Sequence, residues 1–453
     1  MERTEGKATT VLADFVARSR YENLPAEVVA MSKKCLLDWL GNAIGGSCEP
    51  AARHIIDLVK EMGGKKQASI LGVGIRTNVI NAALANGTMA HVLDYDDAHN
   101  VLRTHPSAPL IAALLPAAEC CKATGRDFIT AMAAGFEVSS RVGLALGKGY
   151  YEAGWHATAI LGRFGACAGV GRLLGLDAKG LSYAMALAAT QAGGLRDVFG
   201  TMGKPFHAGK AAADGIVAAM LAQRGFTAPM DILDGGSYFS LVFSLAYESE
   251  AITKDLGIAY DLTNISFKPY AACLLVHPVV DGLILLGKEY RLTPEEIEEV
   301  RVEVAPLNIK VAGNERPASG LEGKFSIHFT AALAILFGRA GTSLFSDDMV
   351  RDTRVRSMMA KIRLEGRPDY GETEANICVR MRRGVVREIR VRFPKGDPRN
   401  PLSLAEIQEK FTDLCEGLLS KKRVQRIVEL VGRLEDEKDM AALARLCCKN
   451  CRG

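Results

Sequence analysis

The segment HVLDYDDAHNVLRTHP (91–106) holds the densest group of side chains that could do chemistry. It contains three of the eight histidines and three aspartates. If this segment is helical, His91, Asp94 and Ala98 share one face, so that several polar groups converge. His105 is followed by a proline and an apolar segment that predicts a helix, whose N-terminal dipole would favour an anion nearby. The alternative is a polar loop between two helices without a chemical role.

A divalent metal site is a second interpretation of the same segment, because histidines and carboxylates at three-residue spacing are typical of such sites. It would use His91, Asp94, Asp97 and His99. The segment matches neither the His-Glu-x-x-His pattern nor an EF-hand loop. We therefore predict a site without a metal, with the metalloenzyme as an alternative.

Three later segments each place a basic side chain near a predicted helix start. In GWHAT (154–158) a histidine opens a Gly/Ala-rich helix, where it either caps the backbone or donates a proton into a cleft. In GLRDVFGTMGKPFHAG (194–209) glycines allow close backbone approach and Lys204 stands where anions are attracted. In FKPYAACLLVHP (267–278) a lysine and a histidine lie where the composition changes. Because clefts between domains are common ligand sites, this lysine and this histidine would be well placed to bind a ligand.

Nucleotide cofactors are not expected, because no Walker loop and no Gly-x-Gly-x-x-Gly after a strand is present. Cys273 could be a nucleophile, but a thiol among alanines and leucines is usually an inert core residue. We expect no cofactor of any kind.

The elements around these segments are mostly helical. Apolar residues recur at helical spacing over 26–45, and the following Ala-rich stretches predict a bundle with short links. These stretches are 127–146, 156–174, 181–192 and 207–224. After 268–278 the pattern alternates, which predicts strands at 300–304, 376–381 and 386–393, with Gly384 in a hairpin turn between the last two. Helices are expected at 324–339 and 347–361, and again through 404–446.

The size and composition of the chain limit the classes of protein to which it can belong. The 453 residues suggest two or three domains, and a net charge of +4 from 56 basic and 52 acidic residues is too balanced for nucleic-acid binding. No apolar run reaches the ~20 residues of a membrane helix, and MERTEGK has no signal-peptide character, so we expect a cytoplasmic protein. Eleven scattered cysteines predict no disulfide framework, and the pair Cys448 and Cys451, next to Cys447, lacks a second pair at zinc-site spacing.

Taken together, the four segments resemble the MmgE/PrpD family over nearly the full length. The matching motifs, as they stand here, are His91-x-x-Asp-Tyr-Asp-Asp, Thr104-His-Pro-Ser, Gly154-Trp-His, Phe199-Gly-Thr-Met-x-Lys-Pro-x-His-Ala-Gly, and Lys268-Pro through His277. Members of this family dehydrate, decarboxylate or epimerise small polycarboxylates.

The resemblance implies a mainly α fold: a helical-bundle domain from both chain ends (1–268 and 400–453) and an inserted α+β lid with an antiparallel sheet (269–399). It also implies a site in the cleft, a homodimer, and no required metal or iron–sulfur cluster. The active-site groups carried over by position are Asp94, His105, His156, Lys204, Lys268 and His277. Ala98 and Gly203 replace hydroxyl-bearing or thiol residues that the family often has, which suggests a different substrate or reaction.

The resulting hypothesis is a cofactor-free lyase that moves a proton next to a carboxylate. Lys204 and Lys268 would clamp substrate carboxylates, and His105 and His156 would be base and acid in an order left open. Asp94 would orient an imidazole and His277 would also be catalytic, while the further substrate-binding residues are Arg103, Arg196 and Tyr270. An epimerase of a substituted succinate and a non-catalytic binding protein are the alternatives.

Overall fold

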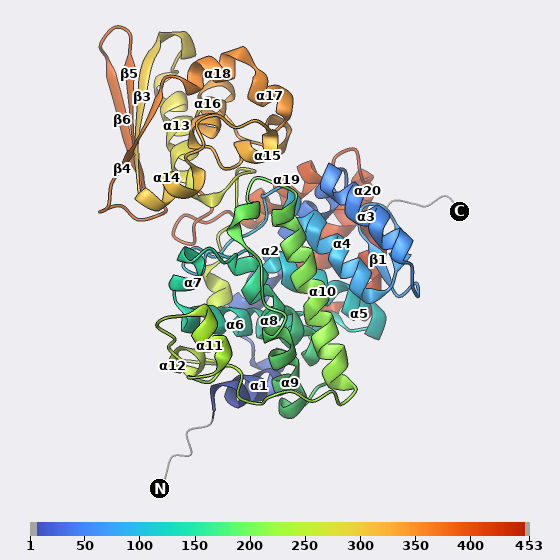
Figure 1. Ribbon diagram of the computed structural model, residues 1–453. Coiled ribbons are helices and arrows are strands. Elements are labelled where there is room, and N and C mark those ends of the chain that lie inside the picture. Colours follow the sequence, from blue (N-terminus) through green and yellow to red (C-terminus); the bar gives the residue numbers. More distant parts are fainter. Residues whose placement is uncertain (1–6, 449–453) are drawn as a thin grey trace.

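The structure of the protein is a computed structural model that describes residues 7–448. Figure 1 shows a large body of helices, with a smaller part above it in which helices pack beside a sheet. We call these two parts the helical body and the sheet domain. Two separate stretches of the chain build the helical body, and the stretch between them builds the sheet domain. The architecture is mainly α, as predicted.

The first stretch of the helical body contains most of its helices. They are α1 (Ala8–Arg18), α2 (Ala26–Gly46), α3 (Pro50–Met62), α4 (Val79–Val92), α5 (Ser107–Cys121), α6 (Gly125–Leu146), α7 (Gly149–Glu152), α8 (Ala157–Leu173), α9 (Ala178–Ala189), α10 (Gly203–Gln223), α11 (Tyr238–Phe243) and α12 (Glu250–Thr253). A short antiparallel hairpin of β1 (Ala68–Ile70) and β2 (Ile75–Thr77) interrupts them. The long helices predicted from apolar spacing are confirmed as α2, α6, α8, α9 and α10.

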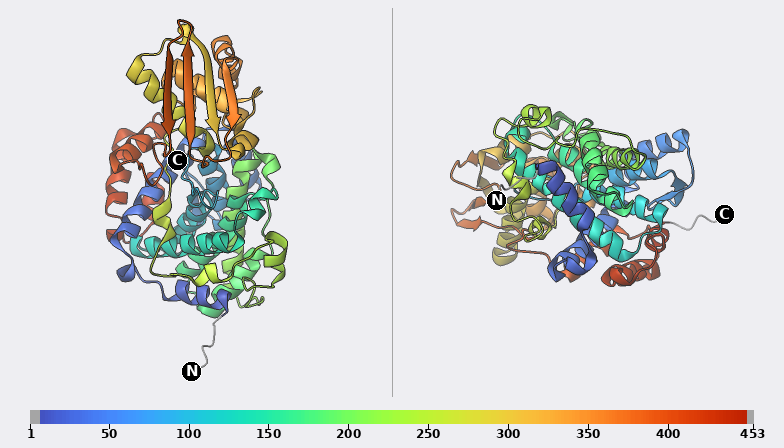
Figure 2. Two further views of the ribbon diagram at one scale, coloured as in Figure 1. Left: turned by 90° about the vertical axis from the view of Figure 1, so that its left-hand side faces the viewer. Right: turned by 90° about the horizontal axis from the view of Figure 1, so that it is seen from below.

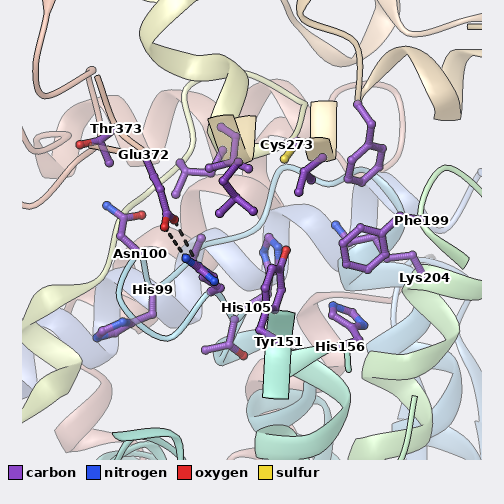
Figure 3. Close-up of a pocket in the computed structure, with 18 residues that line it drawn as sticks. His99, Asn100, His105, Tyr151, His156, Phe199, Lys204, Cys273, Glu372 and Thr373 are labelled. Carbon is purple, nitrogen blue, oxygen red and sulfur yellow. Dashed lines mark hydrogen bonds and ion pairs between the residues drawn. The ribbon is translucent and has the colours of Figure 1, made fainter. Parts of the chain in front are cut away.

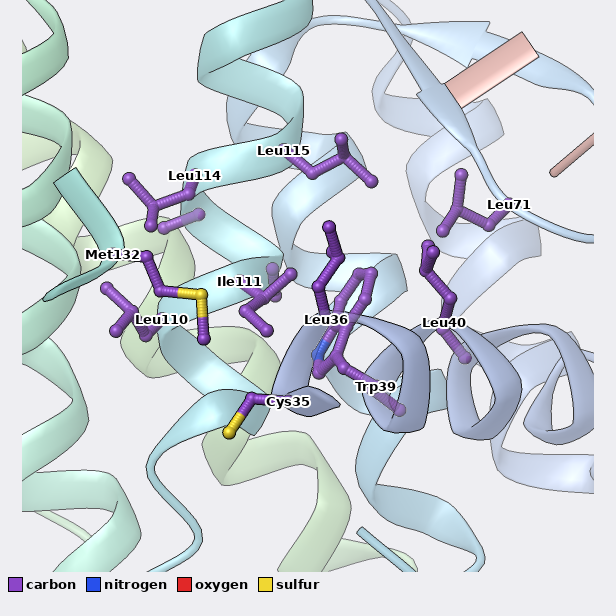
Figure 4. Close-up of a cluster of buried hydrophobic side chains, with 14 of the residues drawn as sticks. Cys35, Leu36, Trp39, Leu40, Leu71, Leu110, Ile111, Leu114, Leu115 and Met132 are labelled. Atoms are coloured by element: carbon purple, nitrogen blue, oxygen red, sulfur yellow. The ribbon is translucent and has the colours of Figure 1, made fainter. Parts of the chain in front are cut away.

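Large side chains of α2 fill the space beside α5 and α6, as Figure 4 shows for Leu36 and Trp39. Trp39 is almost wholly buried, and its indole N–H donates to the carbonyl of Ala108 at 3.2 Å. A buried indole needs such a partner, because an unpaired polar group away from water destabilises the fold. This contact fixes α2 to the start of α5, the helix that follows the 91–106 segment.

Helices α4 and α10 approach each other closely because glycines face one another. A methyl group on Gly87 would lie 2.7 Å from Cα of Gly209, and one on Gly209 would lie 2.2 Å from the carbonyl oxygen of Leu84. No side chain larger than hydrogen fits at either position. The contact holds the start of α10, with Lys204, beside the end of α4.

The sheet domain contains a four-stranded sheet in the order β4-β3-β5-β6. Its strands are β3 (Ile297–Val304), β4 (Ile362–Gly366), β5 (Ala375–Met381) and β6 (Val386–Val391). The predicted β5–β6 hairpin is confirmed, with Gly384 at φ 78°. The predicted small antiparallel sheet is extended by β4, which pairs parallel with β3 and makes the sheet mixed. Strand β4 escaped prediction because it is short and only Ile362 is buried in it.

Helices of the sheet domain pack against one side of the sheet (Figures 1 and 2). They are α13 (His277–Tyr290), α14 (Pro306–Ala312), α15 (Gly320–Gly323), α16 (Ile327–Phe337), α17 (Asp347–Arg351) and α18 (Thr353–Met359). The two helices predicted at 324–339 and 347–361 are each present but altered. The first begins later, with Ser326 as the N-cap of α16, and the second is split at Asp352, which caps α18.

The second stretch of the helical body returns to α2 with α19 (Leu404–Leu414), α20 (Lys421–Gly432) and α21 (Ala441–Leu446). Residues 268 and 400, the expected domain boundaries, lie between named elements, and the boundaries themselves stay a prediction. None of the helices within 7–448 is both long and apolar enough to span a membrane. Cys447 is buried in the core, and Cys451 lies outside the described residues, so the terminal Cys-x-x-Cys prediction is not tested.

Candidate active site

The chain leaves the helical conformation just before Asp94. Helix α4 ends at Val92, and Asp94 adopts φ 51°, a left-handed conformation that few residues other than glycine, asparagine and aspartate adopt. Ala98 pairs instead with Ser266, through N–H···O bonds of 2.9 and 2.8 Å. The expectation that His91, Asp94 and Ala98 share a helix face is therefore wrong. A tight turn, and not a helix, presents the carboxylates.

Lysines from distant segments converge on this turn. Asp94 Oδ1 accepts hydrogen bonds from Lys268 Nζ at 2.6 Å and from Lys204 Nζ at 2.9 Å. Lys268 also donates to the carbonyl of Asp94, and Lys324 donates to the carbonyl of Leu93. Burial disfavours the charged carboxylate, but the two ammonium groups outweigh it and hold the pKa of Asp94 well below its usual range. Burial lowers the pKa of Lys324 to about 8.

Two imidazoles share the next carboxylate of the turn. Nδ1 of His91 lies 2.8 Å from Oδ2 of Asp96, and Nδ1 of His105 lies 3.4 Å from the same oxygen. Nδ1 of His105 is also 2.9 Å from the carbonyl oxygen of Asp97. A carbonyl oxygen only accepts, so Nδ1 carries the proton and the neutral ring keeps its lone pair on Nε2. Burial lowers the pKa of His105 to about 4, which keeps the ring neutral near pH 7.

A second histidine pair stands beside the first. His156 is the N-cap residue of α8, but its side chain makes no capping hydrogen bond. Its Nδ1 lies 3.0 Å from Nδ1 of His207, so one ring donates to the other. Its ring stacks with that of His91 at 6.1 Å and meets Phe199 edge-on at 4.9 Å. Burial and the neighbouring imidazoles and Lys204 hold the pKa of His156 well below its usual range.

A pocket lies between this cluster and the sheet domain. His105, His156 and Lys204 line it from the helical body. Figure 3 shows Cys273 and Glu372 on the opposite side, above Tyr151 and His156. Three of the predicted catalytic residues thus face one cavity. Cys273 borders the cavity, and burial raises the pKa of its thiol, which agrees with the expectation of an unreactive side chain.

Arg103 lines the pocket, and its guanidinium group contacts two acidic side chains. It adopts φ 52° and forms an ion pair with Glu372, with Nη2 to Oε1 at 2.5 Å and Nε to Oε2 at 3.3 Å. A second acid, Glu152, lies 3.5 Å away. The predicted substrate-binding arginine therefore joins the helical body to the sheet domain in this structure.

The other predicted residues lie outside the pocket lining. Lys268 is fully buried behind Asp94. Arg196 donates to the carbonyl of Tyr151 and covers its ring at 4.3 Å. Tyr270 donates to Asp281 at 2.8 Å, and its ring packs edge-on against His277. His277 is buried, with Nε2 on the carbonyl of Ala272 at 3.2 Å, so it supports the 268–278 segment and does not face the cavity.

The four residues of the metal interpretation are not gathered. Asp94 is bound by lysines, Asp97 accepts hydrogen bonds from Ser107, and His99 Nε2 lies 2.9 Å from Asp261. A different trio, His91, Asp96 and His105, brings ligand-type atoms within 4.8 Å of one another. The hydrogen bond from His105 Nδ1 to a backbone carbonyl already uses the nitrogen nearest Asp96. The trio therefore fits a hydrogen-bonded cluster better than a set of metal ligands.

Sequence reasoning missed several participants. His207 lies within the Lys204 motif and Asp96 within the first segment, so their positions were visible although their roles were not. Lys324 and Glu372 come from the sheet domain and carry no local signal. Only their place in the folded chain brings them to the site.

Models of one protein family match nearly the whole chain. The MmgE/PrpD N-terminal domain matches residues 10–250, and the MmgE/PrpD C-terminal domain matches residues 270–436. A cis-aconitate decarboxylase-like protein of Aspergillus oryzae is 28% identical, covering 98% of this chain and 97% of that protein. The mouse cis-aconitate decarboxylase is 26% identical, covering 97% and 93%. The 2-methylcitrate dehydratase of Escherichia coli K12 is 23% identical, covering 87% and 88%.

Proposed function

The chain belongs to the MmgE/PrpD family, and we propose that it is a lyase that acts on a small di- or tricarboxylate by proton transfer next to a carboxylate. The observation that carries this proposal is the meeting of His105, His156 and Lys204 at one cavity. Relatives named decarboxylase and dehydratase support the reaction class.

His105 is proposed as the group that exchanges a proton with the substrate carbon. Its Nδ1–H is held by the carbonyl of Asp97, so Nε2 offers a lone pair. In a dehydration, Nε2 takes the proton next to the carboxylate, the C–O bond breaks, and the leaving hydroxyl group takes a proton from His156 and departs as water. In a decarboxylation, the C–C bond to carbon dioxide breaks, its electron pair stays on the carbon, and that carbon takes a proton that Nε2 has first picked up from solvent. Either transfer can contribute roughly 10²- to 10⁴-fold to the rate.

Lys204 is proposed to stabilise the negative charge that develops on the substrate carboxylate. Its ammonium contacts Asp94 at 2.9 Å and lies at the pocket, which leaves donors for an anion. Lys268 acts through Asp94, because it is buried and does not reach the cavity. Asp94 fixes both ammonium groups, and its Oδ1 also lies 4.0 Å from Nε2 of His105, which supports the proposal that it helps to orient that imidazole.

His156 is proposed as the second proton-transfer group. The short Nδ1–Nδ1 contact with His207 gives it a neighbour that is less buried and closer to solvent. A proton donated by His156 can be replaced through His207, which would keep the site ready for the next turnover.

The test is the reaction in deuterium oxide with a panel of polycarboxylates, followed by NMR. We expect deuterium at the carbon next to a carboxylate, either in recovered substrate or in product. His105→Asn should lose at least 10²-fold of this activity, while His54→Asn, a surface change in α3, should keep it. A folded wild-type protein that transfers no deuterium to any acid would point to a binding protein. Full activity in His105→Asn would refute the assigned base.

We also propose that the reaction needs no metal. Activity should survive dialysis against a strong chelator, with the metal content of the protein measured afterwards. Loss of activity that a divalent cation restores would support the trio of His91, Asp96 and His105 as ligands and contradict this proposal.

A further inference from the structure

The two sides of the pocket differ in chemistry. The helical body supplies imidazoles and an ammonium group, whereas the sheet domain supplies mainly apolar side chains, with Glu372 and Thr373 at the edge where Arg103 lies. Leu274 and Leu275 come from a single 3₁₀ turn, η4 (Leu274–Val276). Leu307 and Val311 come from α14, four residues apart and therefore on one face of that helix. All four are only partly buried by the protein itself. They form what we call the apolar wall.

Two aromatic rings continue the apolar wall toward the ammonium group. Phe325 and Phe199 lie 5.5 Å apart, centroid to centroid. Nζ of Lys204 lies 5.1 Å from the first ring centroid and 5.5 Å from the second. The rings lie between the ammonium group of Lys204 and the apolar wall.

The positive charge around the pocket can neutralise only a few carboxylates of a substrate. Three lysines of this region, Lys204, Lys268 and Lys324, lie near two ionised carboxylates, those of Asp94 and Asp96. The net charge of this group is therefore one positive charge. The guanidinium of the pocket is already paired with an acid that also lines it. A carboxylate placed against the apolar wall would lose its hydration without a partner, which is strongly unfavourable.

We propose that the substrate carries, besides the carboxylate held at Lys204, an alkyl arm longer than methyl that lies against the apolar wall. This inference rests on the proposed function and names its substrate class: an alkyl-substituted di- or tricarboxylate. The reacting carbon lies between the two ends, next to His105, with the arm directed at Leu307 and Val311 of α14.

The experiment compares one polycarboxylate with its methyl-, propyl- and pentyl-substituted forms. Binding is measured by calorimetry and turnover by NMR, both on the full-length wild-type protein. Each buried methylene should improve binding by about fourfold, so the propyl acid should bind roughly fifteenfold more tightly than the methyl acid. The value of kcat/KM should rise in parallel.

Variants of the apolar wall test where the arm lies. Val311→Thr keeps the shape of the side chain but adds a hydroxyl, and Leu307→Asn removes apolar surface. Each should reduce the preference for propyl over methyl several-fold. The matched control is Leu285→Asn on α13, an exposed leucine of the same domain outside the pocket, which should keep the preference.

The outcomes separate this inference from the proposed function. If affinity rises with arm length but none of the acids is turned over, the inference about the alkyl arm is supported and the proposed lyase function is refuted. Affinity that stays flat or falls with arm length overturns the inference, whether or not the acids react. A preference that survives both wall variants also overturns it.

Discussion

Asp97 serves the site with its backbone while its own side chain stays uncharged. Its carbonyl holds Nδ1–H of His105 at 2.9 Å, and its carboxyl accepts hydrogen bonds from Ser107 at the start of α5. Burial, together with nearby Asp38, raises the pKa of Asp97 to about 8. The sequence presents the aspartates of this turn as equals, but in the structure Asp94 and Asp96 are ionised and Asp97 is neutral, and each has different partners.

Asp97→Asn should therefore stabilise the protein in a pH-dependent way. A carboxyl whose folded pKa lies above its unfolded value stabilises the fold fully below about pH 4 and loses that contribution as the pH rises through about 8. Asparagine does not titrate. The unfolding free energy of the variant should therefore exceed that of wild type by an amount that grows by on the order of 1 kcal/mol per pH unit between pH 5 and 8. Urea unfolding at several pH values measures it.

Activity provides the control for this variant. Because only the backbone of residue 97 holds His105, Asp97→Asn should keep most of the wild-type rate at pH 7. The two proteins should be equally stable near pH 4. A stability difference that does not change with pH would mean that Asp97 is ionised in the folded protein.

At the scale of elements, apolar spacing predicted the long helices but not the local breaks that build the site. The sequence after α4 could continue as a helix, yet the chain turns because Asp94 adopts a left-handed conformation held by Lys268 and Lys204. Those lysines are 174 and 110 residues away. Local pattern cannot report a conformation that distant partners stabilise.

The ion pair between Arg103 and Glu372 should control how firmly the sheet domain closes over the pocket. Both side chains are partly buried, and they join the loop before α5 to the segment between β4 and β5. Arg103→Gln and Glu372→Gln should each favour opening by about 1 kcal/mol, which corresponds to roughly fivefold faster hydrogen exchange at amides 370–374. Mass spectrometry of peptides from this segment measures the change.

The charge-reversed double variant Arg103→Glu with Glu372→Arg provides the comparison. It should restore part of the protection in 370–374, while amides of the β5–β6 turn at 382–385 should exchange as in wild type in every variant. Equal exchange in wild type and both single variants would show that the ion pair does not hold the domain.

At the scale of the whole molecule, the meeting of the two chain ends followed only from the family resemblance. Helical spacing in 404–446 shows which face is buried but not what covers it, so the C-terminal helices fitted either domain. Lysine side chains are usually exposed, yet Lys410 of α19 is buried. Its Nζ lies 2.6 Å from Oδ1 of Asp38 in α2 and donates to the carbonyls of Tyr95 and Lys268, at 2.5 and 3.0 Å.

Lys410 thus ties both ends of the chain to the two segments that carry the site, and its removal should affect stability and activity together. Lys410→Met leaves the carboxylate of Asp38 buried without its partner, which should cost about 3 to 5 kcal/mol of unfolding free energy. The double variant Asp38→Asn with Lys410→Met removes both charges and should recover much of this loss. It should not recover kcat, because the carbonyls of Tyr95 and Lys268 still lack their donor.

Denaturant unfolding and the deuterium assay separate the two effects, with the exposed Lys422→Met on α20 as control. A double variant no more stable than the single one, or one with wild-type turnover, would contradict this role.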